Sequence, residues 1–375
     1  MASQFAGASL WFAGNAVLAD LQRAWGLPPQ ALGWTTSAVQ LGFIAGTLAF
    51  AFFAVADRHS PRAVFLLCAL AGAAANALLL AADGGLAALL ALRFATGFFL
   101  AGIYPVGMKI ASGWYQRDLG NALGFLVGAL VAGTAFPHLL RGLGGNLPWQ
   151  LVMLGASGVA ALGGLAMFAL VPDGPHLSKG ARFDPRALAA VFRVPAFRAS
   201  AFGYFGHMWE LYAFWAFVPA VLAARGAPEV PLWSFAVIAS GALGCVAGGL
   251  ASLRLGSAPV AFAQLAASGL CCLASPFVYH APLPALLAFL LFWGVVVVGD
   301  SPQFSALNAH SAPRERVGSA LTIANCIGFG ITIFSIEALN AAWRHLDPRW
   351  LFLLLAPGPA LGLVALAPLM RRTPA

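Results

Sequence analysis

The chain has 375 residues, of which 61% are hydrophobic and only 9% are charged. A soluble domain carries about 25% charged residues, because charged side chains keep a folded surface dispersed in water. The composition therefore excludes a soluble enzyme, a nucleic-acid-binding protein and a disordered chain, and it predicts an integral membrane protein. The net charge of +8 is typical of membrane proteins whose cytoplasmic loops collect basic residues.

Twelve stretches are long and apolar enough to cross a bilayer, since a helical span needs about 20 mostly apolar residues. The runs are continuous rather than alternating, which excludes a β-barrel. The predicted fold is an all-α integral membrane protein with twelve transmembrane helices in two six-helix bundles. In chain order the predicted spans are 3–19, 31–55, 63–82, 86–112, 119–140, 149–171, 199–224, 231–253, 257–279, 284–309, 317–340 and 349–370.

Basic residues in the loops predict the orientation. Most of them lie on the cytoplasmic side if both termini are cytoplasmic. The long polar stretch 172–198 is predicted to be a cytoplasmic linker between an N-terminal bundle, 1–171, and a C-terminal bundle, 199–375. The first span has no basic residues before it, so it is not expected to be a cleavable signal peptide, and residues missing before Met1 are left open. The preference for arginine over lysine suggests a bacterial source, and hence the bacterial inner membrane.

The two predicted halves share a motif. Gly102-Ile-Tyr-Pro105 lies in the fourth span and Gly299-Asp-Ser-Pro302 in the tenth, and an arginine follows each proline by twelve residues. Six plus six spans related by a parallel repeat are typical of rocker-type transporters. Glycines at 120, 124 and 128 in the fifth span predict close packing against another helix.

The loop after the second span, Ala56-Asp57-Arg58-His59-Ser60-Pro61-Arg62, resembles the D-R-x-G-R-R loop of the major facilitator superfamily, with Ser60-Pro61 in place of Gly-Arg. The resemblance implies that Asp57, Arg58 and Arg62 form a switching loop that latches the two halves. The alternative is a solvated basic loop. The matching segment after the eighth span, 253–257, keeps an arginine and a glycine but lacks the aspartate.

Arg93 and Gly97 in the fourth span resemble the R-x-x-x-G pattern of the same superfamily, in which a buried arginine is often tied to proton coupling. The sequences of spans four, five and ten most resemble those of the nitrate/nitrite and cyanate porters. Nitrate itself is not expected as the substrate, because the second span lacks the substrate-clamping arginine of nitrate porters.

Ionisable side chains inside a bilayer are costly and are functional candidates. Arg93 is predicted to bind substrate, since an anion near the midplane needs a positive group; the alternatives are an internal salt bridge or an interfacial position. Lys109 is expected to snorkel or to pair with a loop carboxylate such as Asp118. The intramembrane set is Arg93, Lys109, His207, Glu210, Asp300 and, nearer a helix end, Glu337.

The seventh span holds the densest polar cluster. Tyr204, His207 and Trp215 share a helical stripe and are predicted to bind substrate, while Glu210 lies one turn beyond His207. A buried His207–Glu210 pair is predicted to hold and release a proton. The alternative is ordinary packing in which Glu210 satisfies His207.

Asp300 is the second proton-coupling candidate, because Pro302 frees a backbone carbonyl beside it, and Gln303 is a candidate substrate contact. A structural hydrogen bond is the alternative role for Asp300. Further polar positions within spans are each predicted to join helices rather than to bind ligand: Gln40, Asn15, Gln264, Asn308 and Asn325.

The leading functional hypothesis is a secondary active transporter that moves a small organic or inorganic anion by proton-coupled alternating access. The alternatives are efflux of hydrophobic or cationic compounds, and a non-transporting receptor on the same fold. No zinc-protease, hydrolase-elbow or Walker motif occurs in the sequence, so no enzymatic activity, cofactor or metal site is predicted. The expected partners are a small-molecule substrate, protons and the lipid bilayer, without nucleic acid, and the protein is expected to be a monomer.

Overall fold

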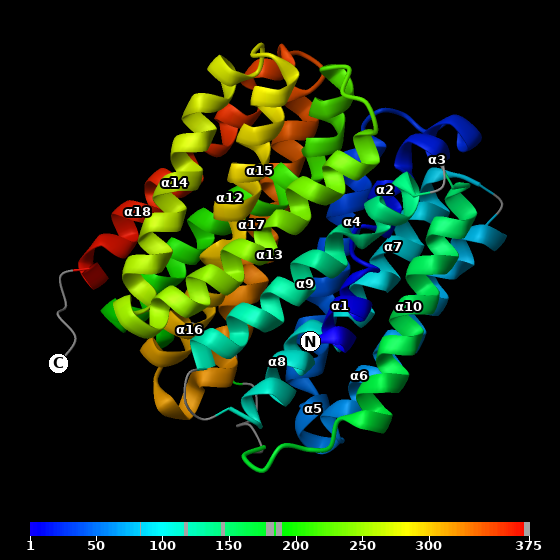
Figure 1. Ribbon diagram of the computed structural model, residues 1–375. Helices are drawn as coiled ribbons and strands as arrows, with labels where there is room; N and C mark the ends of the chain where they lie inside the picture. Colours follow the sequence, from blue (N-terminus) through cyan, green and yellow to red (C-terminus); the bar gives the residue numbers. More distant parts are fainter. Residues whose placement is uncertain (83, 116–118, 144–146, 178–183, 185–189, 371–375) are drawn as a thin grey trace.

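A computed structural model describes residues 1–82, 84–115, 119–143, 147–177, 184 and 190–370. The predicted linker lies largely outside this part, as do Arg117 and Asp118. Every regular element in the described part is a helix, and the helices run side by side (Figure 1).

The helices before the linker pack mostly against one another. The first predicted span is not one helix, because the chain leaves helical geometry around residues 9–12. The elements are α1 (Ala2–Ala8), α2 (Ala13–Ala16), α3 (Leu18–Trp25), α4 (Ala31–Phe52), α5 (Val55–Arg58), α6 (Pro61–Ala77), the 3-10 turn η1 (Leu78–Ala81), α7 (Leu86–Leu100), α8 (Tyr104–Ser112), α9 (Leu119–Gly142) and α10 (Trp149–Leu170).

The helices after the linker form the second group. A single helix of 30 residues, α12, is the longest among them and packs against several of its neighbours. The elements are α12 (Pro195–Ala224), α13 (Val230–Leu255), α14 (Ser257–Val278), α15 (Leu283–Gly299), α16 (Ser301–Ser311), η2 (Arg314–Arg316), α17 (Val317–Ala342), η3 (Pro348–Leu355) and α18 (Pro357–Met370).

Ten helical segments in the described part are long and apolar enough to cross a membrane, so the predicted count of twelve is not confirmed. The two other predicted spans fall short for different physical reasons. The first is divided among α1, α2 and α3. The seventh lies in α12, which is long enough but carries polar side chains such as His207 and Glu210 in its middle.

The two repeated motifs produce the same local structure. The fourth predicted span is interrupted at residues 101–103, between α7 and α8, and the tenth is interrupted at Asp300, between α15 and α16. Pro105 and Pro302 each lie in the first turn of the helix that follows, where the missing N–H costs nothing. Corresponding helices of the two halves are therefore broken at corresponding places.

The two halves touch mainly where α9 packs on α13 and α4 packs on α17, and α9 also contacts α16. The first contact is very close, because a Cβ atom added at Gly124 would lie 2.8 Å from the carbonyl oxygen of Cys245. Gly128 approaches Ala242 in the same way, at 3.2 Å from its carbonyl oxygen. The close packing predicted for these glycines is confirmed, and the partner is a helix of the other half.

We expect Gly124→Val to destabilise the protein, because overpacking a close contact costs about 1–3 kcal/mol. The measurement is the melting temperature of the detergent-purified protein. Gly158→Val is the matched control, since a Cβ atom there meets nothing within 4 Å. Equal melting temperatures for the two variants would contradict the assigned interface.

Candidate functional site

A cavity of about 670 Å³ lies between the two halves, at the end of the molecule that carries the loop with Asp57. Its walls come from α4 and α8 on one side and from α12, α16 and α17 on the other. Charged groups of both signs stand where these helices end, and polar uncharged groups lie further along the helices. The first set is Asp57, Lys109, Arg314 and Glu315; the second includes Tyr204, Ser305, Asn308, Thr322 and Asn325.

The opposite end is closed by hydrogen bonds between α4 and α17. The Ser37 hydroxyl donates to Glu337 Oε1 at 2.6 Å. Asn340 Nδ2 donates to the carbonyl oxygen of Gln30 at 3.1 Å and to Glu337 Oε2 at 3.2 Å. Glu337 therefore accepts hydrogen bonds that join the two halves, a role that its position near a helix end did not indicate.

Aromatic rings fill the space between the cavity and the closed end. Trp11 of the first half stacks on Phe329 and on Tyr212 of the second half, with ring centroids 5.6 Å apart in both pairs. The ring centroids of Phe43 and Phe329 are 4.3 Å apart. The two halves therefore meet through a layer of aromatic side chains near the middle of the molecule.

Arg93 is fully buried within the first half. Its Nη1 atom donates to Asn76 Oδ1 at 2.9 Å, and its Nη2 atom donates to the carbonyl oxygens of Leu10 and Trp11 at 3.0 and 2.5 Å. Those carbonyls belong to the break in the first span, where no helical N–H reaches them. None of the ion pairs found in the described part of the chain involves Arg93, and it is not among the residues that line the cavity.

The switching loop is held to its own half by the contacts of two of its residues. Asp57 forms an ion pair with Lys109 of α8, and Lys109 Nζ also donates to the carbonyl oxygen of Ala56 at 2.8 Å. Arg62 forms an ion pair with Asp173, in which Nε and Oδ1 are 3.8 Å apart. The expectation that Lys109 pairs with a loop carboxylate is confirmed, with Asp57 as the partner; Asp118, the example given for that carboxylate, lies outside the described residues.

Arg58, the remaining predicted loop residue, is exposed. Its side chain, with those of Asp57 and Arg62, stands at the end of the molecule where the cavity opens. A latch between the halves through this loop stays a prediction.

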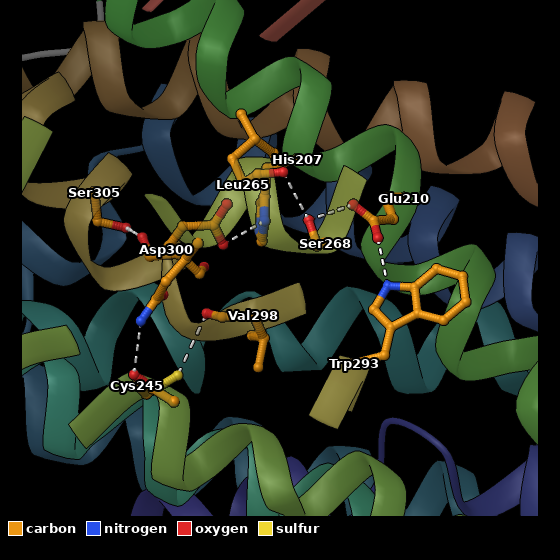
Figure 2. Close-up of polar contacts among 12 residues, drawn as sticks. His207, Glu210, Cys245, Leu265, Ser268, Trp293, Val298, Asp300 and Ser305 are labelled. Carbon is orange, nitrogen blue, oxygen red and sulfur yellow. Dashed lines mark hydrogen bonds and ion pairs between the residues drawn. The ribbon is translucent and has the colours of Figure 1, made fainter. Parts of the chain in front are cut away.

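His207 faces Asp300 rather than Glu210. The His207 Nδ1 and Asp300 Oδ1 atoms are 2.8 Å apart, and each side chain is 1% exposed (Figure 2). Asp300 occupies the break between α15 and α16, which directs its carboxylate toward α12. The predicted His207–Glu210 pair is wrong, because the nearer partner comes from another helix.

Glu210 has its own set of donors (Figure 2). Its Oε1 atom accepts a hydrogen bond from Trp293 Nε1 at 2.7 Å, and its Oε2 atom accepts one from the Ser268 hydroxyl at 2.9 Å. The Cys272 thiol lies 3.4 Å from Oε1. These contacts tie α12 to α14 and α15, and they place the carboxyl group away from the cavity.

Tyr204 connects the cavity to the His207–Asp300 pair. Its ring lines the cavity and stacks on the imidazole of His207, with centroids 6.1 Å apart. Trp215 lies deeper, in a small internal space of about 20 Å³ that Tyr204 also lines. Gln303 is buried, and neither of its amide atoms has a partner in the described part.

The polar residues predicted to join helices do so. Asn15 donates to Thr36, Gln264 donates to the carbonyl oxygen of Gly244, and Gln40 accepts from Trp11. Asn308 and Asn325 accept from the Ser200 and Tyr204 hydroxyls of α12. These two asparagines also line the cavity, which sequence spacing alone did not indicate.

We expect Arg93→Met to lower the free energy of unfolding by about 1–3 kcal/mol for each acceptor that loses its donor. Arg93→Lys should retain part of the stability, because an ammonium group can still donate. The measurement is the melting temperature, and Arg344→Met is the control because that arginine is exposed. An Arg93→Met protein as stable as the control would refute the structural role.

The chain matches the profile of the Major Facilitator Superfamily over residues 1–336. It therefore belongs to this superfamily of transporters. No curated protein is significantly similar to it in sequence. The nitrate/nitrite and cyanate branch receives no support.

Two solved structures share the fold. The human organic anion transporter MFSD10 (TETRAN) is similar with a TM-score of 0.72 and 15% identity, over 97% of this chain and 98% of that chain. The proton:xylose symporter XylE, bound to 6-bromo-6-deoxy-D-glucose, has a TM-score of 0.75 and 13% identity, over 100% of this chain and 94% of that chain. At these identities the likeness shows the fold alone.

Proposed function

We propose that the protein is a proton-coupled secondary transporter that moves a small solute, preferentially an organic anion, by alternating access. The proposal divides the chain into bundles 1–171 and 199–375, joined by the cytoplasmic linker 172–198. It places both termini on the cytoplasmic side of a bacterial inner membrane. The cavity then opens to the cytoplasm, and the structure corresponds to an inward-open state.

The observation that carries the proposal is the asymmetry of the two ends. A cavity large enough for a small solute lies at one end, while hydrogen bonds between α4 and α17 close the other. The hydrogen bonds described at the closed end involve one hydroxyl, one carboxylate, one amide and one backbone carbonyl. They can break when the halves rock about the central aromatic layer, as alternating access requires.

We assign the coupling proton to the His207–Asp300 pair. A carboxylate and an imidazole in contact can exist with the proton on either group or with one added, and the change alters the attraction between α12 and the broken helix α15–α16. Tyr204 stacks on His207 and also borders the solute cavity. A solute that contacts Tyr204 is therefore separated from the His207–Asp300 pair only by the Tyr204 ring.

Two transporters of the same fold illustrate this combination. One is an organic anion transporter and the other a proton:xylose symporter, so small organic solutes and proton coupling both occur on this fold. We do not assign Arg93 to the solute in this state, because both of its Nη atoms donate within the first half and its side chain does not line the cavity. The anion is instead expected to meet neutral donors in the cavity.

We expect Asp300→Asn to abolish proton-driven accumulation and to keep solute exchange, because the variant can still rock but cannot carry the proton. The assay uses proteoliposomes with a trapped pH-sensitive dye and a panel of carboxylates that includes succinate and lactate. Uptake against a gradient and counterflow are measured separately.

Glu210→Gln is the matched control, since Glu210 is a buried carboxyl group of the same helix bundle that lies away from the cavity. Coupling lost in Glu210→Gln and kept in Asp300→Asn would overturn the assignment. Ligand binding without any flux in the wild-type protein would favour the receptor alternative.

A further inference from the structure

Two asparagine amides face the cavity with their oxygens already occupied. Asn308 Oδ1 accepts a hydrogen bond from the Ser200 hydroxyl at 2.6 Å. Asn325 Oδ1 accepts one from the Tyr204 hydroxyl at 3.3 Å. Both asparagines line the cavity. None of the hydrogen bonds found in the described part uses either NH₂ group, so both groups have donors left for a ligand.

The two amides are anchored to the same face of one helix. Their partners, Ser200 and Tyr204, are four residues apart on α12 and so lie on the same face, one turn from each other. Their Cα atoms are therefore about 6 Å apart along the helix axis. A small solute that offers oxygen atoms can meet both donors on this face of the cavity.

The described part of the cavity wall carries equal numbers of acidic and basic residues. Among the described residues that line the cavity, the four with formal charge are two acidic and two basic, and all stand at helix ends near the Asp57 loop. Asp57 and Lys109 are paired with each other. The charges at the mouth therefore give no preference for either sign, and the recognition chemistry further in depends on hydrogen bonds.

We propose that Asn308 and Asn325 form a paired donor site that binds an oxygen-acceptor group of the solute, such as a carboxylate or an uncharged carbonyl. The proposal rests on the transport function proposed above and names the chemistry that its cavity selects. A cation with donors alone competes with the Ser200 and Tyr204 hydroxyls for the two amide oxygens. Tyr204 belongs to the same site, because it holds Asn325 and stacks on His207, and it links recognition to the coupling pair.

The test measures ligand binding to the detergent-purified full chain by thermal shift. A ligand that binds the folded form raises its melting temperature. Three probes of similar length separate the chemistries: succinate, succinamide and putrescine. We expect succinate or succinamide to stabilise the wild-type protein and putrescine to have no effect. Stabilisation by succinate alone identifies an anionic group, and stabilisation by both identifies a carbonyl acceptor.

Variants show whether the amides are responsible. Asn325→Asp replaces a donor with an acceptor and is expected to weaken binding of the acceptor probe about tenfold, as is Asn308→Leu. Asn325→Gln keeps an amide and should restore part of the affinity. Asn121→Leu is the control, an asparagine on α9 that does not line the cavity. The melting temperature without ligand verifies that each variant is folded.

Three outcomes overturn the proposal. They are binding of putrescine in preference to the acceptor probes, unchanged affinity in folded Asn308→Leu and Asn325→Asp proteins, and no binding of either acceptor probe. Failure here is separable from failure of the transport proposal. Proton-coupled flux with unaffected asparagine variants refutes the donor site alone, whereas asparagine-dependent binding without coupled flux refutes the transport mechanism alone.

Discussion

The guanidinium group of Arg93 and the carbonyl groups of the broken first span form the contact on which the centre of the molecule depends. Within a bilayer, each backbone polar group needs a partner inside the protein, and a break in a helix leaves carbonyl oxygens without one. Arg93 donates to the oxygens of Leu10 and Trp11 and so stabilises a non-helical turn. That turn brings Trp11 against Phe329 and Tyr212 of the other half, and the resulting layer separates the cavity from the closed end.

The helix break at Asp300 positions a functional side chain in the second half, as the break in the first span does in the first half. It frees the chain to direct a carboxylate across to His207 from the single residue between α15 and α16. Tyr204 then lies between this pair and the cavity. One side chain thus contacts the proposed proton site and the proposed solute site, which is the short path that coupling needs.

Sequence patterns predicted the helical class, most of the spans and the repeated motif at which both halves turn out to break, because the thickness of a bilayer and the chemistry of proline act locally along the chain. They did not predict the partners of buried polar side chains. Spacing of three residues favoured a His207–Glu210 pair, yet Asp300 and Trp293 come from segments some 90 residues away, and only tertiary packing brings them close. The break in the first span was equally hidden, since no proline marks it and Arg93, which stabilises it, is remote in sequence.

The His207–Asp300 pair is proposed to carry one proton, while the inner part of the cavity binds the solute through uncharged groups. This combination determines how much charge crosses the membrane in each transport cycle. If one proton is the only charge that crosses with a neutral solute, each cycle moves one elementary charge through the membrane field. A potential of 100 mV then contributes about 2.3 kcal/mol, enough for roughly 50-fold accumulation of the solute. A monovalent anion carried with the same proton makes the cycle electroneutral, so only the pH gradient would drive it, and the charge of the cargo decides which component of the proton-motive force the protein consumes.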